Sequence, residues 1–229
     1  DDLKRSFYEV ECIRGNWSVR ELRRQIGSLY YERSGLSRNK EKLAELVNAK
    51  DNHLNTGILG TKYLLDALSE NGHEERVYTI VTQKTFPGWG YWVEQGATTM
   101  WERWSGKSTG GSGKNFTFLT EVDVWFYNYI LGIKVMEEEP AYKQFEISPY
   151  FFEKLDWAKG RIATMYGEIK VDWSKNGSSI SYNVTIPENT SAIFKAPKGY
   201  RIKRTQKDKR LGSGIHTIIF EEVNPTKSL

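Results

Sequence analysis

The first part of the chain carries its hydrophobic residues at a helical period. After Ser18 and Glu21, which together form a capping box, apolar residues recur every three or four positions up to about residue 46. The same period returns between about 57 and 133, where the most strongly apolar stripe ends at Gly132. These patterns predict two helical regions.

From about residue 141 the period changes to two, which is typical of strands. Short alternating segments follow one another at intervals of about 8–12 residues, separated by turn signals such as Asn176-Gly177. They are residues 145–147, 162–165, 168–173, 180–186, 191–194 and 215–220. Because the helices come first and the strands last, the order predicts separate α and β modules, the second a β-sandwich.

The composition agrees with a folded chain. Of the 229 residues, 38% are hydrophobic and 27% are charged, and no apolar run approaches the length of about 18 residues that a membrane-spanning helix needs. A single cysteine, Cys12, excludes an internal disulfide, and no pair of histidines has the spacing of metal ligands. We therefore predict neither a metal nor another cofactor. Because the chain begins at Asp1 without a leader pattern, we expect it to start within a longer protein or after processing.

The net charge of +4 is unevenly distributed. Residues 51–140 contain 12 acidic and 7 basic side chains, and four of the eight tryptophans lie within this region between positions 89 and 104. An acidic surface rich in tryptophan suits a neutral sugar better than a phosphate backbone, so nucleic acid is not the expected partner of this region. The basic side chains Arg20, Arg23 and Arg24 keep association with nucleic acid open as an alternative for residues 1–46.

The densest group of chemically active residues lies between Gly96 and Trp104. Here Glu102 stands between two tryptophans and beside Arg103. Neighbouring rings raise the pKa of a carboxyl by desolvation, whereas a nearby guanidinium lowers it. The residue types alone leave two readings, a catalytic carboxylate or an ion pair of Glu102 with Arg103 next to core tryptophans.

Three segments with matching order and spacing resemble the C-terminal half of bacterial α-L-rhamnosidases, the glycoside hydrolases of family 78. They are His53–Leu65, Phe86–Tyr91 and Gly96–Trp104. The resemblance covers about residues 46–222. It implies an α then all-β chain, with part of an (α/α)6 six-hairpin barrel followed by an antiparallel β-sandwich. The domains expected from it are a helical segment at 1–46, the barrel part at 47–139 and the β-sandwich at 140–229.

The resemblance also implies an activity, the inverting hydrolysis of terminal α-L-rhamnosides, for which two carboxylates are needed. Glu102 matches the general base of the family. The residues expected to contact the carbohydrate are His53, Trp89, Trp92, Trp101, Arg103 and Trp104. The residue type of His53 is equally compatible with a hydrogen-bonded structural role.

Two departures from the family change these expectations. The family's general acid lies upstream in a motif rich in Asp, Arg and Glu, and no such motif precedes residue 50. The sugar-binding histidine that commonly follows the Glu102 segment in the family is also absent. We therefore expect that the missing half of the barrel, or a homo-oligomer, completes the fold, and that the apolar stripe around Val122 and Trp125 is exposed without it. A truncated module that binds carbohydrate or a partner without turnover is the alternative function.

The first residues resemble a different family. Residues 7–26 and 31–37 are similar to the N-terminal helical domain of bacterial proteins that carry a predicted PD-(D/E)xK nuclease domain. The nuclease motif itself does not occur in this chain. Both resemblances point to a bacterial protein, and its compartment, cytoplasmic or periplasmic and secreted, stays open.

Overall fold

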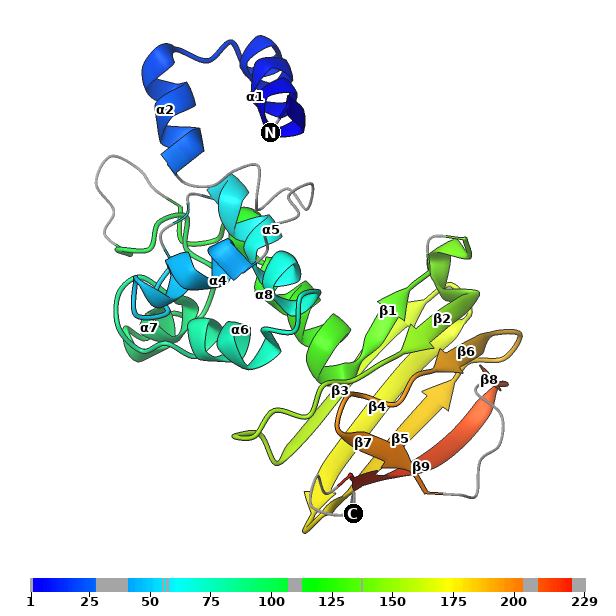
Figure 1. The fold of residues 1–229 in the computed structure, drawn as a ribbon. Coiled ribbons are helices and arrows are strands. Elements are labelled where there is room, and N and C mark those ends of the chain that lie inside the picture. The colour runs from blue at the N-terminus through cyan, green and yellow to red at the C-terminus, as the bar shows by residue number, and fades with distance from the viewer. Residues whose placement is uncertain are drawn as a thin grey trace, which may run out of the picture. The chain divides into compact units, whose positions relative to one another are not determined.

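The computed structural model describes residues 2–27, 41–54, 56, 58–106, 113–136, 138–203 and 210–223. The chain divides into two compact units, Asp1–Val122 and Asp123–Leu229. The first unit consists of helices, and the second contains the strands (Figure 1). The predicted order of an α region followed by a β-sandwich is confirmed. The domain boundaries at 46/47 and 139/140 stay predictions.

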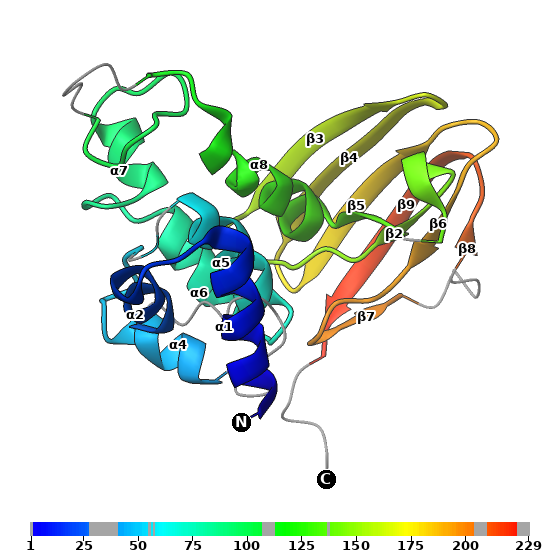
Figure 2. The same cartoon turned by 90° about the horizontal axis from the view of Figure 1, so that it is seen from above.

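The helices of the first unit are short and joined by turns (Figure 2). They are α1 (Asp2–Gly15), α2 (Val19–Gly27), α4 (Glu41–Asn48), α5 (Ile58–Ser69), α6 (Glu74–Val81), α7 (Trp89–Glu94), the 3-10 turn η1 (Thr117–Leu119) and α8 (Glu121–Trp125), which continues into the second unit. The backbone N–H of Glu21 donates to the Ser18 hydroxyl at 3.2 Å, as a capping box requires. The helical pattern of residues 28–40 lies outside the described residues.

A helical hairpin of α5 and α6 forms the centre of this unit. The chain reverses at Asn71-Gly72, where the side chain of Asn71 donates to the Ala67 carbonyl and Gly72 adopts a φ of 81°. Leu65 and Val77, one from each helix, are almost completely buried. These residues therefore form the turn between the two helices, and α5 also contacts η1.

The strands of the second unit form two sheets. The strands are β1 (Ile133–Val135), β2 (Gln144–Ile147), β3 (Trp157–Thr164), β4 (Gly167–Asn176), β5 (Ser179–Ile186), β6 (Ser191–Phe194), β7 (Tyr200–Ile202), β8 (Arg210–Leu211) and β9 (Gly214–Glu222), with a 3-10 turn η3 (Pro140–Tyr142) before β2. The smaller sheet has the order β1-β2-β6-β8 and the larger one β3-β4-β5-β9-β7. The pairs are antiparallel, with the exception of the parallel pair β2 and β6.

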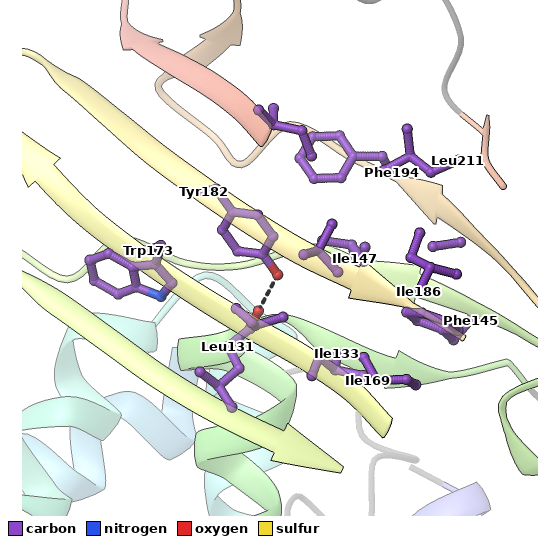
Figure 3. Packing of buried hydrophobic residues seen from close by; sticks show 14 of the residues in the cluster. Leu131, Ile133, Phe145, Ile147, Ile169, Trp173, Tyr182, Ile186, Phe194 and Leu211 are labelled. Carbon is purple, nitrogen blue, oxygen red and sulfur yellow. Dashed lines mark hydrogen bonds between the residues drawn. The ribbon is translucent and has the colours of Figure 1, made fainter. Parts of the chain in front are cut away.

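The core of the second unit lies between the two sheets (Figure 3). Along β5 every second residue is buried, so that Tyr182 and its inward neighbours meet Phe145 and Phe194 of the smaller sheet. The Tyr182 hydroxyl donates to the carbonyl of Leu131 at 2.6 Å (Figure 3). The indole N–H of Trp173 donates to the neighbouring Ile130 carbonyl at 2.9 Å. Each polar atom of these two large side chains is thereby satisfied inside the core.

The helical segment before β1 corrects one expectation. The apolar stripe continues from α8 into a wider, π-helical turn, η2 (Phe126–Leu131), which ends at Gly132 with a φ of 78°. Val122 and Trp125 are only 2% and 1% exposed, so the expected exposure of these two residues is wrong, whereas Phe126 of the same stripe is 37% exposed. Trp125 stacks on Tyr129 with a ring-centroid distance of 5.7 Å. Completion of the fold by a missing half of the barrel or by a homo-oligomer stays a prediction.

None of the helices within the described ranges is long and apolar enough to span a membrane.

Candidate functional site

Four tryptophans of the Glu102 region lie together in the first unit. Trp89 and Trp92 are one turn apart on α7, and Trp104 contacts both, with ring-centroid distances of 5.1 Å and 4.6 Å. Trp101 lies 5.9 Å from Trp92 on another side. The sequence-predicted residues Trp89, Trp92, Trp101 and Trp104 are therefore brought into one aromatic cluster.

The two tryptophans of α7 serve mainly to hold this cluster together. Trp89 and Trp92 are only 6% and 2% exposed. The indole N–H of Trp89 donates to the Leu119 carbonyl at 3.0 Å, and that of Trp92 donates to the Trp104 carbonyl at 2.9 Å. Because the second bond reaches the backbone next to Arg103, α7 fixes the position of the segment that carries Glu102. Contact of these two rings with a sugar stays a prediction.

Glu102 is anchored twice to one glycine. Its backbone N–H donates to the Gly113 carbonyl at 3.1 Å, and one of its carboxylate oxygens, Oε2, accepts the N–H of Gly113 at 2.8 Å. The N–H of Phe116 donates to the Met100 carbonyl at 2.9 Å, so the two segments run side by side. Residues 107–112, which connect the two segments, lie outside the described residues.

The ion-pair reading of Glu102 is not realised. Arg103 is exposed, and no salt bridge joins its guanidinium to the neighbouring carboxylate. The half-buried Glu102 carboxylate instead has Oε2 fixed by a backbone N–H, while Oε1 has no partner among the described residues. One fixed and one free oxygen is the arrangement that a carboxylate needs to accept a proton in a defined direction.

Two residues that the sequence analysis did not single out shape the other side of Trp101. Gly106 has a φ of 62°, and a Cβ at this position would lie 2.0 Å from the Trp101 ring. The ammonium group of Lys114 lies 5.4 Å from the centroid of the same ring. The glycine-rich composition of residues 106–113 was the available signal, because close approach of backbone to a large ring requires glycine.

His53 has a defined structural environment. Its Nδ1 lies 3.1 Å from the Lys50 carbonyl and its Nε2 lies 2.7 Å from the Thr85 hydroxyl. A carbonyl can only accept, so Nδ1 carries the proton, and in the neutral ring Nε2 accepts from Thr85. The ring thereby ties the turn after α4 to the segment that leads into α7. Both nitrogens are occupied, which favours the structural reading, and contact with a sugar stays a prediction.

Within the described ranges, no three His, Cys, Asp or Glu side chains gather in a way that could hold a metal ion.

Comparisons with known proteins identify two matching domain families. Residues 29–130 match the bacterial alpha-L-rhamnosidase 6 hairpin glycosidase domain, and residues 132–210 match the bacterial alpha-L-rhamnosidase C-terminal domain. The chain is 38% identical over 168 residues to an alpha-L-rhamnosidase of Alteromonas sp. (strain LOR) and 33% identical over 174 residues to one of Streptomyces avermitilis. These alignments cover 70% and 72% of this chain, but only 18% and 17% of the relatives.

Solved structures agree with these matches. An α-L-rhamnosidase from Dictyoglumus thermophilum is similar with a TM-score of 0.73 and 31% identity, over 83% of this chain and 24% of that one. The Streptomyces avermitilis α-L-rhamnosidase complexed with L-rhamnose is similar with a TM-score of 0.68 and 30% identity, over 79% of this chain and 19% of that one.

A short segment is similar to another protein, the predicted nuclease YhcG of Escherichia coli (strain K12), with 37% identity over 78 residues. That alignment covers 31% of this chain and 21% of YhcG. The two rhamnosidase domain families cover residues 29–130 and 132–210, in the same order as the helical unit and the β-sandwich. Residues 29–210 therefore belong to the bacterial α-L-rhamnosidase family, as a part of its six-hairpin glycosidase domain followed by its C-terminal domain.

Proposed function

We propose that this chain supplies the general-base part of an α-L-rhamnosidase-type glycoside hydrolase. The observation that carries the proposal is the setting of Glu102, which lies within the six-hairpin match at residues 29–130. One of its carboxylate oxygens is fixed by Gly113, and the other has no partner within the part of the chain that the structure describes. The reaction proposed is the inverting hydrolysis of terminal α-L-rhamnosides.

In this reaction Oε1 of Glu102 accepts a proton from a water molecule while that water forms a bond to the anomeric carbon of the sugar. The glycosidic bond breaks, and a carboxylic acid outside this chain gives its proton to the leaving oxygen. Inversion requires the two carboxyl groups to lie roughly 6.5–9.5 Å apart, so that the water fits between base and sugar. The N–H of Gly113 keeps the Glu102 carboxylate from rotating.

The residues around Glu102 have different roles in this proposal. We assign sugar contact to Trp104, which is half-buried, and to the exposed Arg103 beside Glu102. Trp101 is 9% exposed and contributes the wall on the side of Lys114. Trp89 and Trp92 support these residues from behind, and His53 fixes the approach to α7.

The test uses a complete enzyme that carries this segment, such as a chimera with the N-terminal part of the Dictyoglumus thermophilum α-L-rhamnosidase. Glu102→Gln keeps the size and the bond to Gly113 but removes the basicity. We expect kcat to fall by about 10²-fold or more with little change in KM, and azide to restore part of the activity. The first sugar released by the parent chimera should have inverted configuration at the anomeric carbon.

The matched control is Glu94→Gln, the same substitution at an exposed carboxylate of α7 that pairs with Lys84. It should leave kcat within about twofold of the parent chimera. Near-normal kcat in the Glu102→Gln enzyme would reduce this residue to a structural role. Binding of L-rhamnose without any hydrolysis by the parent chimera would support the alternative, a carbohydrate- or partner-binding module. The isolated chain should show no turnover, because no acid motif precedes residue 50.

A second candidate concerns the first residues only. A short segment of this chain is similar to the nuclease YhcG, and the exposed arginines of α2 place the candidate, association with nucleic acid, in residues 1–46. However, Arg24 is paired with Glu21 on α2, which leaves Arg20 and Arg23 as the freely exposed cations of that helix. A DNA mobility shift that weakens with salt and is lost in the Arg20→Ala, Arg23→Ala double variant would support this role. Unchanged binding in that variant would exclude it.

A further inference from the structure

We propose that the outward face of strands β3, β4 and β5 is a second carbohydrate-binding surface, which takes an acidic, uronate-bearing oligosaccharide. This surface belongs to the β-sandwich and is independent of turnover at Glu102. It is hollowed into a depression of about 570 Å³. The side chains that line it and carry the argument are Lys159, Arg161, Lys170, Asp172, Asn183 and Thr185.

The register of the larger sheet places these side chains in two parallel rows. In one row Lys159 lies opposite Asp172, and Asp172 lies opposite Asn183. In the other row Arg161 lies opposite Lys170, which lies opposite Thr185 (β3, β4 and β5 in Figures 1 and 2). Their positions alternate with the buried residues of β4 and β5, so all of them point away from the core.

The charges of this face favour an anion. Arg161 and Lys170 are like charges directly opposite one another in the sheet, an arrangement that is destabilising by itself. Glu168 binds both cations at 3.1 Å, and the Lys170 ammonium, with Arg161, holds the pKa of Glu168 below its usual value. Glu168 holds Arg161 and Lys170 in place, but its single negative charge compensates only one of their two positive charges.

A second cation of the depression lacks a direct ion-pair partner. Lys159 is exposed and makes no ion pair with a described residue, although Asp172 stands opposite it in the sheet. With Asp172 and Glu168 against Lys159, Arg161 and Lys170, these five side chains carry a net charge of +1. A carboxylate placed between Lys159 and Arg161, which are two positions apart on the same face of β3, would meet both cations. A sugar acid supplies such a carboxylate on a ring that also carries hydroxyl groups.

Groups for the rest of a sugar lie on the same face. Trp157 is 65% exposed, and its register partner on β4 is the small Ser174, so a wide surface of the indole is open. A large exposed ring next to charged residues is uncommon, and its flat apolar face matches the C–H face of a pyranose. The Thr217 hydroxyl donates to Oδ1 of Asn183, which leaves the amide N–H groups of Asn183 to donate to sugar hydroxyls.

The spacing of these groups suggests the length of the ligand. Trp157 and Arg161 are four residues apart on β3, about 13 Å at a rise of about 3.3 Å per residue. A single sugar ring is too short to reach from one to the other. The geometry therefore points to an oligosaccharide that stacks one ring on Trp157 and places a uronate between the cations.

The experiment measures binding of a galacturonate trimer to the full chain by isothermal titration calorimetry at low ionic strength, with the methyl-esterified trimer as the neutral probe. We expect the acidic trimer to bind and the ester to bind at least about fivefold more weakly, and binding of the acid to fall with added salt. Lys159→Ala and Arg161→Ala should each weaken binding by about fivefold, the upper range for an exposed charge pair. Trp157→Ala should weaken it by a similar factor.

The controls repeat the same chemical changes outside the depression. Lys198→Ala removes an exposed lysine of the turn before β7, and Met165→Ala removes an 80% exposed apolar side chain of the turn between β3 and β4. Neither should change affinity. The proposal is overturned by equal binding of acid and ester, by no binding at millimolar trimer, or by equal losses in the control variants. Equal binding of single-stranded DNA of the same charge also overturns it, because the face would then be a general polyanion surface.

This proposal and the proposed function fail separately. The calorimetry needs no turnover and no complete barrel. L-rhamnose, the sugar expected at Glu102, should not displace the galacturonate trimer from the β-sandwich. Displacement by L-rhamnose would place the trimer at the first unit and contradict the assignment to β3, β4 and β5.

Discussion

At the scale of single residues, Tyr182 allows one buried hydrogen bond to be weighed separately from the packing around it. Its ring is completely buried, and its hydroxyl donates to the Leu131 carbonyl at 2.6 Å. Tyr182→Phe keeps the ring and leaves that buried carbonyl without this donor. We expect the free energy of unfolding to fall by about 1–3 kcal/mol, measured by urea denaturation.

The matched control for this prediction is Tyr127→Phe. The Tyr127 hydroxyl also donates to a backbone carbonyl, that of Arg161 at 3.1 Å, but this bond is exposed. Water can replace the lost donor there, so we expect a loss of about 0.5 kcal/mol or less. Equal losses in the two variants would show that burial of the Leu131 carbonyl does not determine the cost.

Tyr182 also gives a prediction for the dependence of stability on pH. Burial raises the pKa of its hydroxyl well above the ordinary value. In the unfolded chain this hydroxyl has a pKa of about 10, so above that pH the unfolded chain releases a proton that the folded chain retains. The difference in free energy of unfolding between the parent chain and Tyr182→Phe is therefore largest below about pH 10 and should become smaller above that pH. The other tyrosines occur in both proteins and cancel, so a difference that stays constant up to about pH 11 would contradict this.

The parts of the candidate site that could be predicted from the sequence are those formed by distinctive side chains. The segment around Glu102 is distinctive because tryptophan, glutamate and arginine stand next to one another. The group that fixes its carboxylate is the backbone N–H of Gly113, and a backbone group has no sequence signature of its own. The partner of His53 was equally hidden, because Thr85 lies 32 residues away and is brought near only by the fold.

At the scale of elements, the period of two located β2, β4, β5, β6 and β9, found only the last part of β3, and missed the strands of two or three residues. Strands β4 and β5 are buried at every second position over several residues, which is the signal that alternation needs. Strands β1, β7 and β8 have only 3, 3 and 2 residues, too few for any period to be recognised. The parallel pairing of β2 with β6 was also not predictable, since alternation specifies the buried face of a strand and not the direction of its neighbour.

The end of η2 gives a prediction at this scale. Gly132 has a φ of 78°, and a Cβ there would lie 2.3 Å from the backbone nitrogen of Pro149. Gly177, in the turn between β4 and β5, has a φ of 61° but nothing within 4 Å. Gly177→Ala should therefore lower the free energy of unfolding by about 1–2 kcal/mol, because alanine is strained in the left-handed conformation. Gly132→Ala should cost at least about 1 kcal/mol more, because a backbone atom must also move.

Both substitutions are compared by chemical denaturation of the full chain, followed by the loss of near-UV circular dichroism. They introduce the same side chain at the same kind of backbone conformation, so their difference isolates the contact with Pro149. Equal costs would mean that the segment after Ser148 can shift without loss, and that η2 and the smaller sheet are less tightly joined than the distances indicate.

At the scale of the whole molecule, the chain divides into two compact units. The main cluster of the second unit extends from Leu131 to Phe220 and contains no residue of the first. The aromatic cluster beside Glu102 lies entirely in the first unit. The two proposed carbohydrate sites therefore rest on different cores, and a change that unfolds one unit need not remove the other site.

Two fragments test where the second unit begins. A fragment of residues 123–229 contains η2 and β1, whereas one of residues 140–229 starts at the domain boundary expected from the sequence. The shorter fragment lacks the core side chains of Leu131 and Ile133 and the backbone carbonyls that accept from Tyr182 and Trp173. Burial of two such side chains contributes about 1.5–3 kcal/mol each, and each lost buried bond costs about 1–3 kcal/mol.

Together these losses amount to about 5–12 kcal/mol, which is as large as the whole stability of a typical domain. We therefore expect the fragment 123–229 to unfold cooperatively in urea, with a folded circular dichroism spectrum and a transition near that of the second unit in the full chain. The fragment 140–229 should show no cooperative transition. Without β1 the edge of β2 is unpaired, and without η2 the Trp173 indole N–H and the Tyr182 hydroxyl lose their acceptors. Equal cooperativity of the two fragments would support the boundary at 139/140 and would assign η2 and β1 to the helical unit.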